Sequence, residues 1–95
     1  MKVQVGIAKR CSKKLAAGVI AFSEEFGVGV WHQFLYTVLD GKVSPFAEQG
    51  FETKEAAVDD LCEILKIKPD ALVEINEKDV DEYILRNTRN QWSPR

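Results

Sequence analysis

Three kinds of residue in this sequence can carry acid–base, nucleophilic or metal chemistry: one histidine, two cysteines and a group of clustered carboxylates. The histidine, His32, lies in an alternating apolar stretch that places it on the apolar face of a strand, near Val30 and Phe51. We expect a partly buried, hydrogen-bonded histidine there rather than a general base, because a base must lie within reach of its proton. The sequence has no nucleophile elbow, phosphate-binding glycine loop or dinucleotide fingerprint. It therefore predicts a non-enzymatic protein without a cofactor.

The two cysteines, Cys11 and Cys62, lie 51 positions apart and show no metal-site spacing. With a single histidine in the chain they cannot complete a tetrahedral zinc site, so we expect no metal site. Cys11 lies between the basic pairs at 9–10 and 13–14, which favour its thiolate form and its modification. A reactive thiol without a base or a resolving partner is not a catalytic site. We expect a reduced, cytoplasmic protein.

The clearest structural signal is a hairpin over residues 30–51. Two strand-like runs, 30–39 and 42–51, flank Asp40-Gly41, a dipeptide typical of two-residue hairpin turns. Thr53 then precedes an amphipathic stretch and is expected to cap a helix. Counted outward from the turn, one face of the hairpin is a core face; its members are Val30, His32, Phe34, Tyr36, Val38, Val43, Ala47 and Phe51.

The opposite face of the hairpin is half apolar. Trp31, Leu35 and Phe46 alternate there with polar residues, and this is more apolar surface than a solvated face needs. We therefore expect another element or a binding partner to cover it. Pro45 lacks an amide proton, which places the second strand at an edge or at a bulge.

Residues 12–26 can be assigned in two ways. A helix would align Leu15, Val19, Phe22 and Phe26 on one stripe, and we favour it because burying that stripe outweighs modest local costs. Gly18 and the reversed order of the flanking charges argue against a helix. The alternative is a strand over residues 15–22.

Further along the chain, the pattern predicts a helix after Thr53, a short strand over 71–75 and a last helix over 77–87. The element order βαββαβ plus a terminal helix predicts an α+β domain with a ferredoxin-like, split βαβ sheet and its helices on one face. The alternative is a four-stranded antiparallel meander followed by helices. Residues 1–87 are expected to form one domain and 88–95 a flexible tail. No apolar run approaches the roughly 18 residues of a membrane span.

Charge is unevenly distributed, although the formal net charge of the 95 residues is only −2. Residues 52–82 carry eleven acids and four lysines, whereas residues 1–14 carry five basic residues and no acid. We predict that the protein binds another protein, as an adaptor, inhibitor or regulatory subunit, through an exposed sheet face and an acidic helix. The residues expected to make these contacts are Trp31, Leu35, Phe46, Asp59, Asp60 and Glu63.

Two alternatives remain open for the function. A nucleic-acid-binding module would combine basic side chains on the phosphate backbone with an indole on a base. Its residues would be Lys9, Arg10, Lys13, Lys14, Arg86, Arg89 and Trp92. A homo-oligomer would instead pair the exposed sheet faces of two copies.

Overall fold

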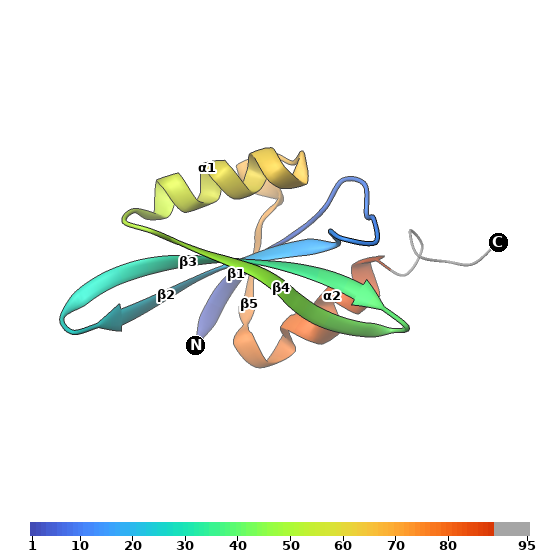
Figure 1. The fold of residues 1–95 in the computed structure, drawn as a ribbon, viewed down its shortest axis with the longest axis horizontal. Coiled ribbons are helices and arrows are strands. Elements are labelled where there is room, and N and C mark those ends of the chain that lie inside the picture. The colour runs from blue at the N-terminus through green and yellow to red at the C-terminus, as the bar shows by residue number, and fades with distance from the viewer. Residues whose placement is uncertain (89–95) are drawn as a thin grey trace.

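A computed structural model of the protein describes residues 1–88. Its strands and α-helices are β1 (Lys2–Ile7), β2 (Ala17–Glu25), β3 (Val28–Leu39), β4 (Lys42–Phe51), α1 (Lys54–Leu65), β5 (Val73–Asn76) and α2 (Val80–Thr88). The strands form one sheet in the order β4-β3-β2-β1-β5, and every neighbouring pair is antiparallel. Helix α1 lies against one face of the sheet and α2 lies against the other (Figure 1). The protein is thus an α+β domain with a five-stranded antiparallel sheet between two helices.

The helix favoured for residues 12–26 was wrong, and with it the ferredoxin-like order with helices on one face. Ala17–Glu25 is β2, a central strand paired with β1 on one side and β3 on the other. Residues 17–20 of this strand are all buried, because each face of the strand is covered by a helix. A short apolar run looks the same in a helical stripe as in a strand buried on both faces. The meander alternative describes β1–β4 better, and β5 adds a fifth strand beside β1.

The predicted hairpin is present, and a bulge changes its facing pattern. Leu39 pairs with Lys42 across the Asp40-Gly41 turn, as expected. The register shifts between Leu35 and Tyr36, where Phe46 is the extra residue. Beyond it, Ala47 and Phe51 move to the face of Leu35 and Trp31, and Glu48 joins the face of His32. Pro45 is tolerated because it lies beside this bulge on an edge strand.

The apolar core has two halves separated by the sheet. The half under α2 is built from Val3, Val5, Ala16, Ala17, Val19, Val38, Val80 and Ile84. The half under α1 is built from Ala8, Ile20, Ala57, Leu61 and Leu65. A sheet with apolar side chains on both faces requires a cover on each, and the two helices supply it.

The ends of the helices follow from local sequence signals. Thr53 caps α1 as predicted, and its Oγ1 accepts a hydrogen bond of 3.1 Å from the Ala56 amide. The helix ends at Lys66, whose left-handed conformation directs its amide to the Cys62 carbonyl. A 3₁₀ turn over Glu77–Asp79 precedes α2, so this helix starts later than predicted and continues through the buried Thr88. Within residues 1–88, no helix has the length and apolar character needed to cross a membrane.

Candidate functional site

The hairpin of β2 and β3 projects beyond the rest of the sheet. Strand β1 pairs with β2 only as far as Ile20, and β4 pairs with β3 only as far as Trp31. The β2–β3 ladder nevertheless continues to the Glu25–Val28 pair. We refer to residues 22–31, which form the end of this hairpin, as the arm. It forms one end of a molecule whose longest extent is 49 Å, against 24 and 21 Å in the other directions (Figure 1).

The tip of the arm carries an aromatic residue in an unfavourable backbone conformation. Phe26 and Gly27 form the turn with φ values of 54° and 79°. The left-handed region suits glycine or asparagine and costs most other residues roughly 1–2 kcal/mol. Phe26 is also fully exposed, with a relative exposure of 102%, and Val28 beside it is 62% exposed. The turn conformation opposes folding, and the exposed ring of Phe26 gains no burial energy that would offset this cost.

The base of the arm is braced on the face that α1 covers. The rings of Phe22 and Trp31 lie 4.7 Å apart between centroids. Gly29 leaves room for this contact, because a Cβ there would lie 2.7 Å from the Phe22 Cζ. The Lys54 ammonium at the start of α1 lies 5.7 Å from the centroid of a Trp31 ring, within cation–π range. These contacts brace the base of the arm against the start of α1.

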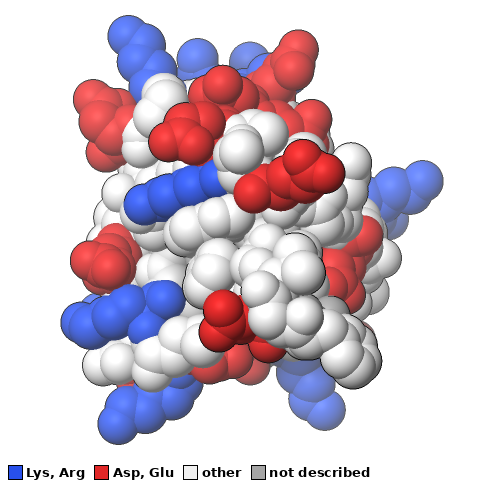
Figure 2. All heavy atoms as spheres, turned by 90° about the vertical axis from the view of Figure 1, so that its left-hand side faces the viewer, with Lys and Arg blue, Asp and Glu red and all other residues white. Residues whose placement is uncertain are grey.

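The surface at this end of the molecule has an uncharged centre. Figure 2 looks onto the end of the long axis where the arm projects, and shows white surface between acidic and basic side chains. The large exposed apolar residues of the arm are Phe22, Phe26 and Val28. Contact surfaces between proteins commonly combine an apolar core with a polar rim.

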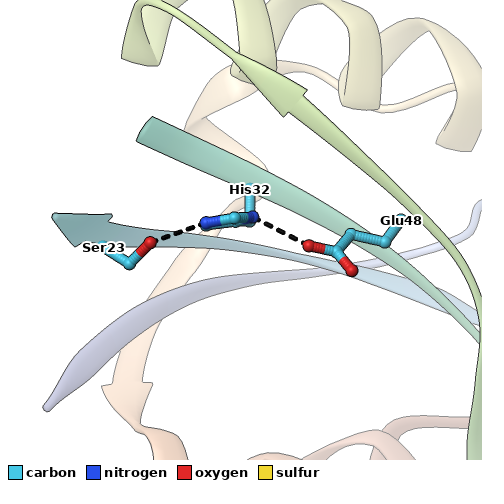
Figure 3. Close-up of polar contacts among 3 residues, drawn as sticks. All are labelled: Ser23, His32 and Glu48. Carbon is cyan, nitrogen blue, oxygen red and sulfur yellow. Dashed lines mark hydrogen bonds and ion pairs between the residues drawn. The ribbon is translucent and has the colours of Figure 1, made fainter. Parts of the chain in front are cut away.

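The opposite face of the arm carries a polar relay across three strands (Figure 3). The Ser23 Oγ lies 2.6 Å from His32 Nε2, and His32 Nδ1 lies 2.8 Å from Glu48 Oε2. With the imidazole proton on Nδ1, the ring donates to Glu48 and accepts from the Ser23 hydroxyl. The imidazole also stacks on Phe34, with 5.9 Å between the ring centroids. Both nitrogens of the half-buried His32 therefore have partners.

This order of groups is also found in serine nucleophiles activated by a histidine and a carboxylate. Acyl transfer further requires donors aimed at the developing oxyanion. α/β-Hydrolases present their serine on a sharp turn beside such donors, whereas Ser23 lies within β2 and is paired with Val30 across the ladder. The relay joins β2, β3 and β4 at the base of the arm.

The structure separates the three apolar residues that the sequence placed on one face. Trp31 and Leu35 pack against the core half under α1, so another element covers them. Phe46, at the bulge, is 47% exposed. It lines a shallow hollow of about 390 Å³ with neighbours that include Phe34 and Tyr36. The three residues therefore do not form one continuous surface.

The three predicted acidic residues also differ in their surroundings. Asp59 and Glu63 are exposed on α1. Asp60 instead accepts a hydrogen bond of 2.9 Å from the side-chain amide of Gln33. Gln33 is buried, with 2% exposure, and its amide also contacts the Ala57 carbonyl at 3.4 Å. Asp60 thus anchors α1 to β3.

The basic residues of the nucleic-acid alternative are distributed over several elements. Lys9, Arg10, Lys13 and Lys14 are exposed in the loop between β1 and β2. Arg86 lies on α2 and forms an ion pair of 3.1 Å with Glu82. The remaining two members, Arg89 and Trp92, lie outside the described residues.

Sequence reasoning missed most of the arm. Phe22 and Phe26 were assigned to an inward helical stripe, and the Phe26-Gly27 turn resembles no common hairpin dipeptide. Ser23 and Glu48 were missed because their approach to His32 depends on β2 being a strand and on the bulge at Phe46. The proline beside the bulge was the one signal in the sequence that pointed to a change of register.

Neither a metal site nor a known relative indicates what this protein does. Across residues 1–88, no three His, Cys, Asp or Glu side chains are grouped so that they could hold a metal ion. Comparisons with protein-family models, with curated proteins and with solved structures find no match to this chain.

Proposed function

We propose that this protein binds another protein and that the arm makes the central contact. The observation that carries the proposal is Phe26, a fully exposed aromatic residue held in a left-handed turn. Asparagine or glycine would make this turn at lower cost, so the isolated fold gains nothing from phenylalanine. A partner that buries the ring supplies the missing stabilisation, since burying such a side chain is worth about 1.5–3 kcal/mol.

The shape of the arm supports this function. An aromatic anchor at the tip of a braced hairpin loses little conformational freedom on binding, which leaves more of its burial energy for affinity. The matching partner surface is an apolar recess, with polar groups at its rim that meet the mixed charges around the arm. The contact thus involves Phe26, Val28 and Phe22 more than the predicted Leu35 and Asp60, which serve the fold.

The test compares two substitutions of exposed phenylalanines. Phe26→Asn creates an Asn-Gly turn, and we expect it to raise the free energy of unfolding by about 1 kcal/mol while removing the anchor. Phe46→Ser, at the β4 bulge, is the control. Affinity capture from the source cells, with quantitative mass spectrometry, should recover a partner with the wild type and with Phe46→Ser. Recovery with Phe26→Asn should fall at least about tenfold, because an anchor residue contributes more than 1 kcal/mol.

Equal recovery with Phe26→Asn and the wild type would contradict a role for the arm in binding. Sedimentation velocity separates a foreign partner from a second copy of the chain. A dimer of the pure protein that is lost in Phe26→Asn would identify the occupant of the arm surface as another copy.

A further inference from the structure

We infer that a second binding site lies away from the arm, in a pocket rimmed by three cationic side chains, and that it takes an acidic peptide segment with an aliphatic anchor. The pocket has a volume of about 320 Å³; we call it the basic pocket, and it is lined by Lys9, Arg10, Leu15, Ile64, Leu65 and Lys66. It lies between the β1–β2 loop and the C-terminal end of α1. Both of these segments lie away from the tip of the β2–β3 hairpin (Figure 1).

Backbone hydrogen bonds preform the pocket. The Lys9 amide donates to the Leu65 carbonyl at 2.9 Å, which ties the loop to the end of α1. The Ser12 amide donates to the Leu15 carbonyl at 2.8 Å, and the Ser12 hydroxyl accepts from the Leu15 amide at 3.2 Å. The Thr37 hydroxyl holds the loop to β3 through the Lys13 carbonyl, at 2.6 Å. A ligand therefore meets a loop that is already ordered, which lowers the entropic cost of binding.

The charges of the pocket select an anion. Among the described residues, no acidic side chain lines the pocket, and none of its three cations forms an ion pair with a carboxylate. Lys13 and Lys14 follow in the same loop and extend the positive surface. Such a concentration of one charge sign attracts and orients a ligand of the opposite sign.

The lining of the pocket favours a peptide over a nucleic acid. Its floor is formed by Leu15, Ile64 and Leu65, and none of its described lining residues is aromatic. Single-stranded nucleic acids gain much of their affinity from bases stacked on aromatic rings. A leucine-sized side chain of a peptide can instead pack on the aliphatic floor, while carboxylates on either side of it pair with the cationic rim. The volume of the pocket, near the lower limit for ligand pockets, suits a single side chain of this size.

The experiment measures fluorescence anisotropy with a fluorescein-labelled peptide of alternating leucines and aspartates. We expect saturable binding, and binding at least about tenfold weaker when serines replace the leucines or asparagines replace the aspartates. The double variant Lys9→Glu/Arg10→Glu should weaken binding about tenfold or more. The double variant Lys42→Glu/Lys78→Glu makes the same change in net charge at exposed lysines outside the pocket, and it should retain the wild-type Kd within about twofold.

Lys66→Gly separates loss of binding from loss of folding. Lys66 has a φ of 63°, a conformation that glycine adopts without strain. The variant should therefore have a higher Tm than the wild type and yet bind the peptide about threefold more weakly, because it removes one rim cation.

Three results would overturn the inference. The first is equal binding of the serine peptide, which would leave no role for the aliphatic floor. The second is an equal loss of peptide affinity in the Lys42→Glu/Lys78→Glu control, which would show that the affinity depends on the net charge of the protein and not on the pocket. The third is tighter binding of a single-stranded oligonucleotide of matched charge, weakened by Lys9→Glu/Arg10→Glu, which would assign the loop to nucleic acid.

Discussion

The two cysteines differ in burial, and this difference changes the reactivity of their thiols. No disulfide joins them. Cys11 is half-buried in the basic loop, and its Sγ lies 3.6 Å from the Ala16 carbonyl oxygen. Cys62 is buried on α1, and burial raises the pKa of its thiol; the nearby carboxylates of Asp59 and Asp70 raise this pKa further. We expect thiol reagents at neutral pH to modify Cys11 much faster than Cys62.

The raised pKa of Cys62 predicts a change of stability with pH. The unfolded chain ionises this thiol near its ordinary pKa of 9.0, whereas the folded chain keeps it protonated to higher pH. The contribution of the thiol to the free energy of unfolding is thus complete below pH 9.0 and is lost as the pH rises above it. Urea unfolding of the wild type and of Cys62→Ala should give a stability difference that narrows between pH 8 and pH 10. A constant difference across this range would contradict the effect.

At the scale of elements, the position of α1 depends on one glycine of β2. A Cβ at Gly18 would overlap the Leu61 Cδ1, and the Leu61 side chain is fully buried. We expect Gly18→Ala to lower the free energy of unfolding by about 1–3 kcal/mol, the usual cost of overpacking a core. The control is Gly50→Ala on β4, where the new Cβ meets only Val30 Cγ1, at an ordinary 3.4 Å. Urea titration should show little change for Gly50→Ala, and similar losses for both variants would be inconsistent with this packing.

A second contact of α1, the hydrogen bond from Gln33, involves Asp60 but not the adjacent Asp59. Asp60→Ala removes the 2.9 Å partner of the buried Gln33 amide, and we expect a loss of about 1–3 kcal/mol in unfolding free energy. Asp59→Ala changes the helix propensity equally but removes only an exposed carboxylate, so its effect should lie within about 0.5 kcal/mol. Thermal or chemical unfolding measures both. An equal effect of the two substitutions would show that Asp60 does not anchor the helix.

At the scale of the whole molecule, the sheet divides the buried core into two halves, one under each helix. Ile20 belongs to the half under α1 and Ile84 to the half under α2. Substituting either by valine should cost about 0.5–1.5 kcal/mol. The double variant should lose the sum of the two within about 0.5 kcal/mol, because substitutions without shared contacts are additive. A larger interaction energy in this double-mutant cycle would mean that the sheet transmits packing changes between its faces.

The two proposed binding surfaces lie on different parts of the molecule, one at the end of the β2–β3 hairpin and the other between the β1–β2 loop and the end of α1. The arm offers an apolar anchor, whereas the basic pocket offers cations above an aliphatic floor. We expect partners that recognise such different chemistry to bind without competing for the same surface. This arrangement is compatible with an adaptor, one of the roles proposed from the sequence.

The sequence by itself determined those turns, caps and strands that depend on residues close together along the chain. The Asp40-Gly41 turn, the Thr53 cap and the short strand around residue 74 were all predicted, because each depends on conformational preferences within a few residues. The α+β class followed from the same signals. The sequence also limited the chemistry, since it contains one histidine and no common catalytic motif.

Tertiary structure alone decided what residues 17–25 are and which face each side chain of β4 occupies. The apolar run of β2 fits a helix or a strand equally well, and only its pairing with β1 and β3 decides between them. The bulge at Phe46 inverts the alternation that follows, so Glu48 reaches His32 and Phe51 turns to α1. The arm and the relay both depend on these long-range pairings. The candidate site could therefore not be read from residue spacing, because spacing records neighbours along the chain and not neighbours across the sheet.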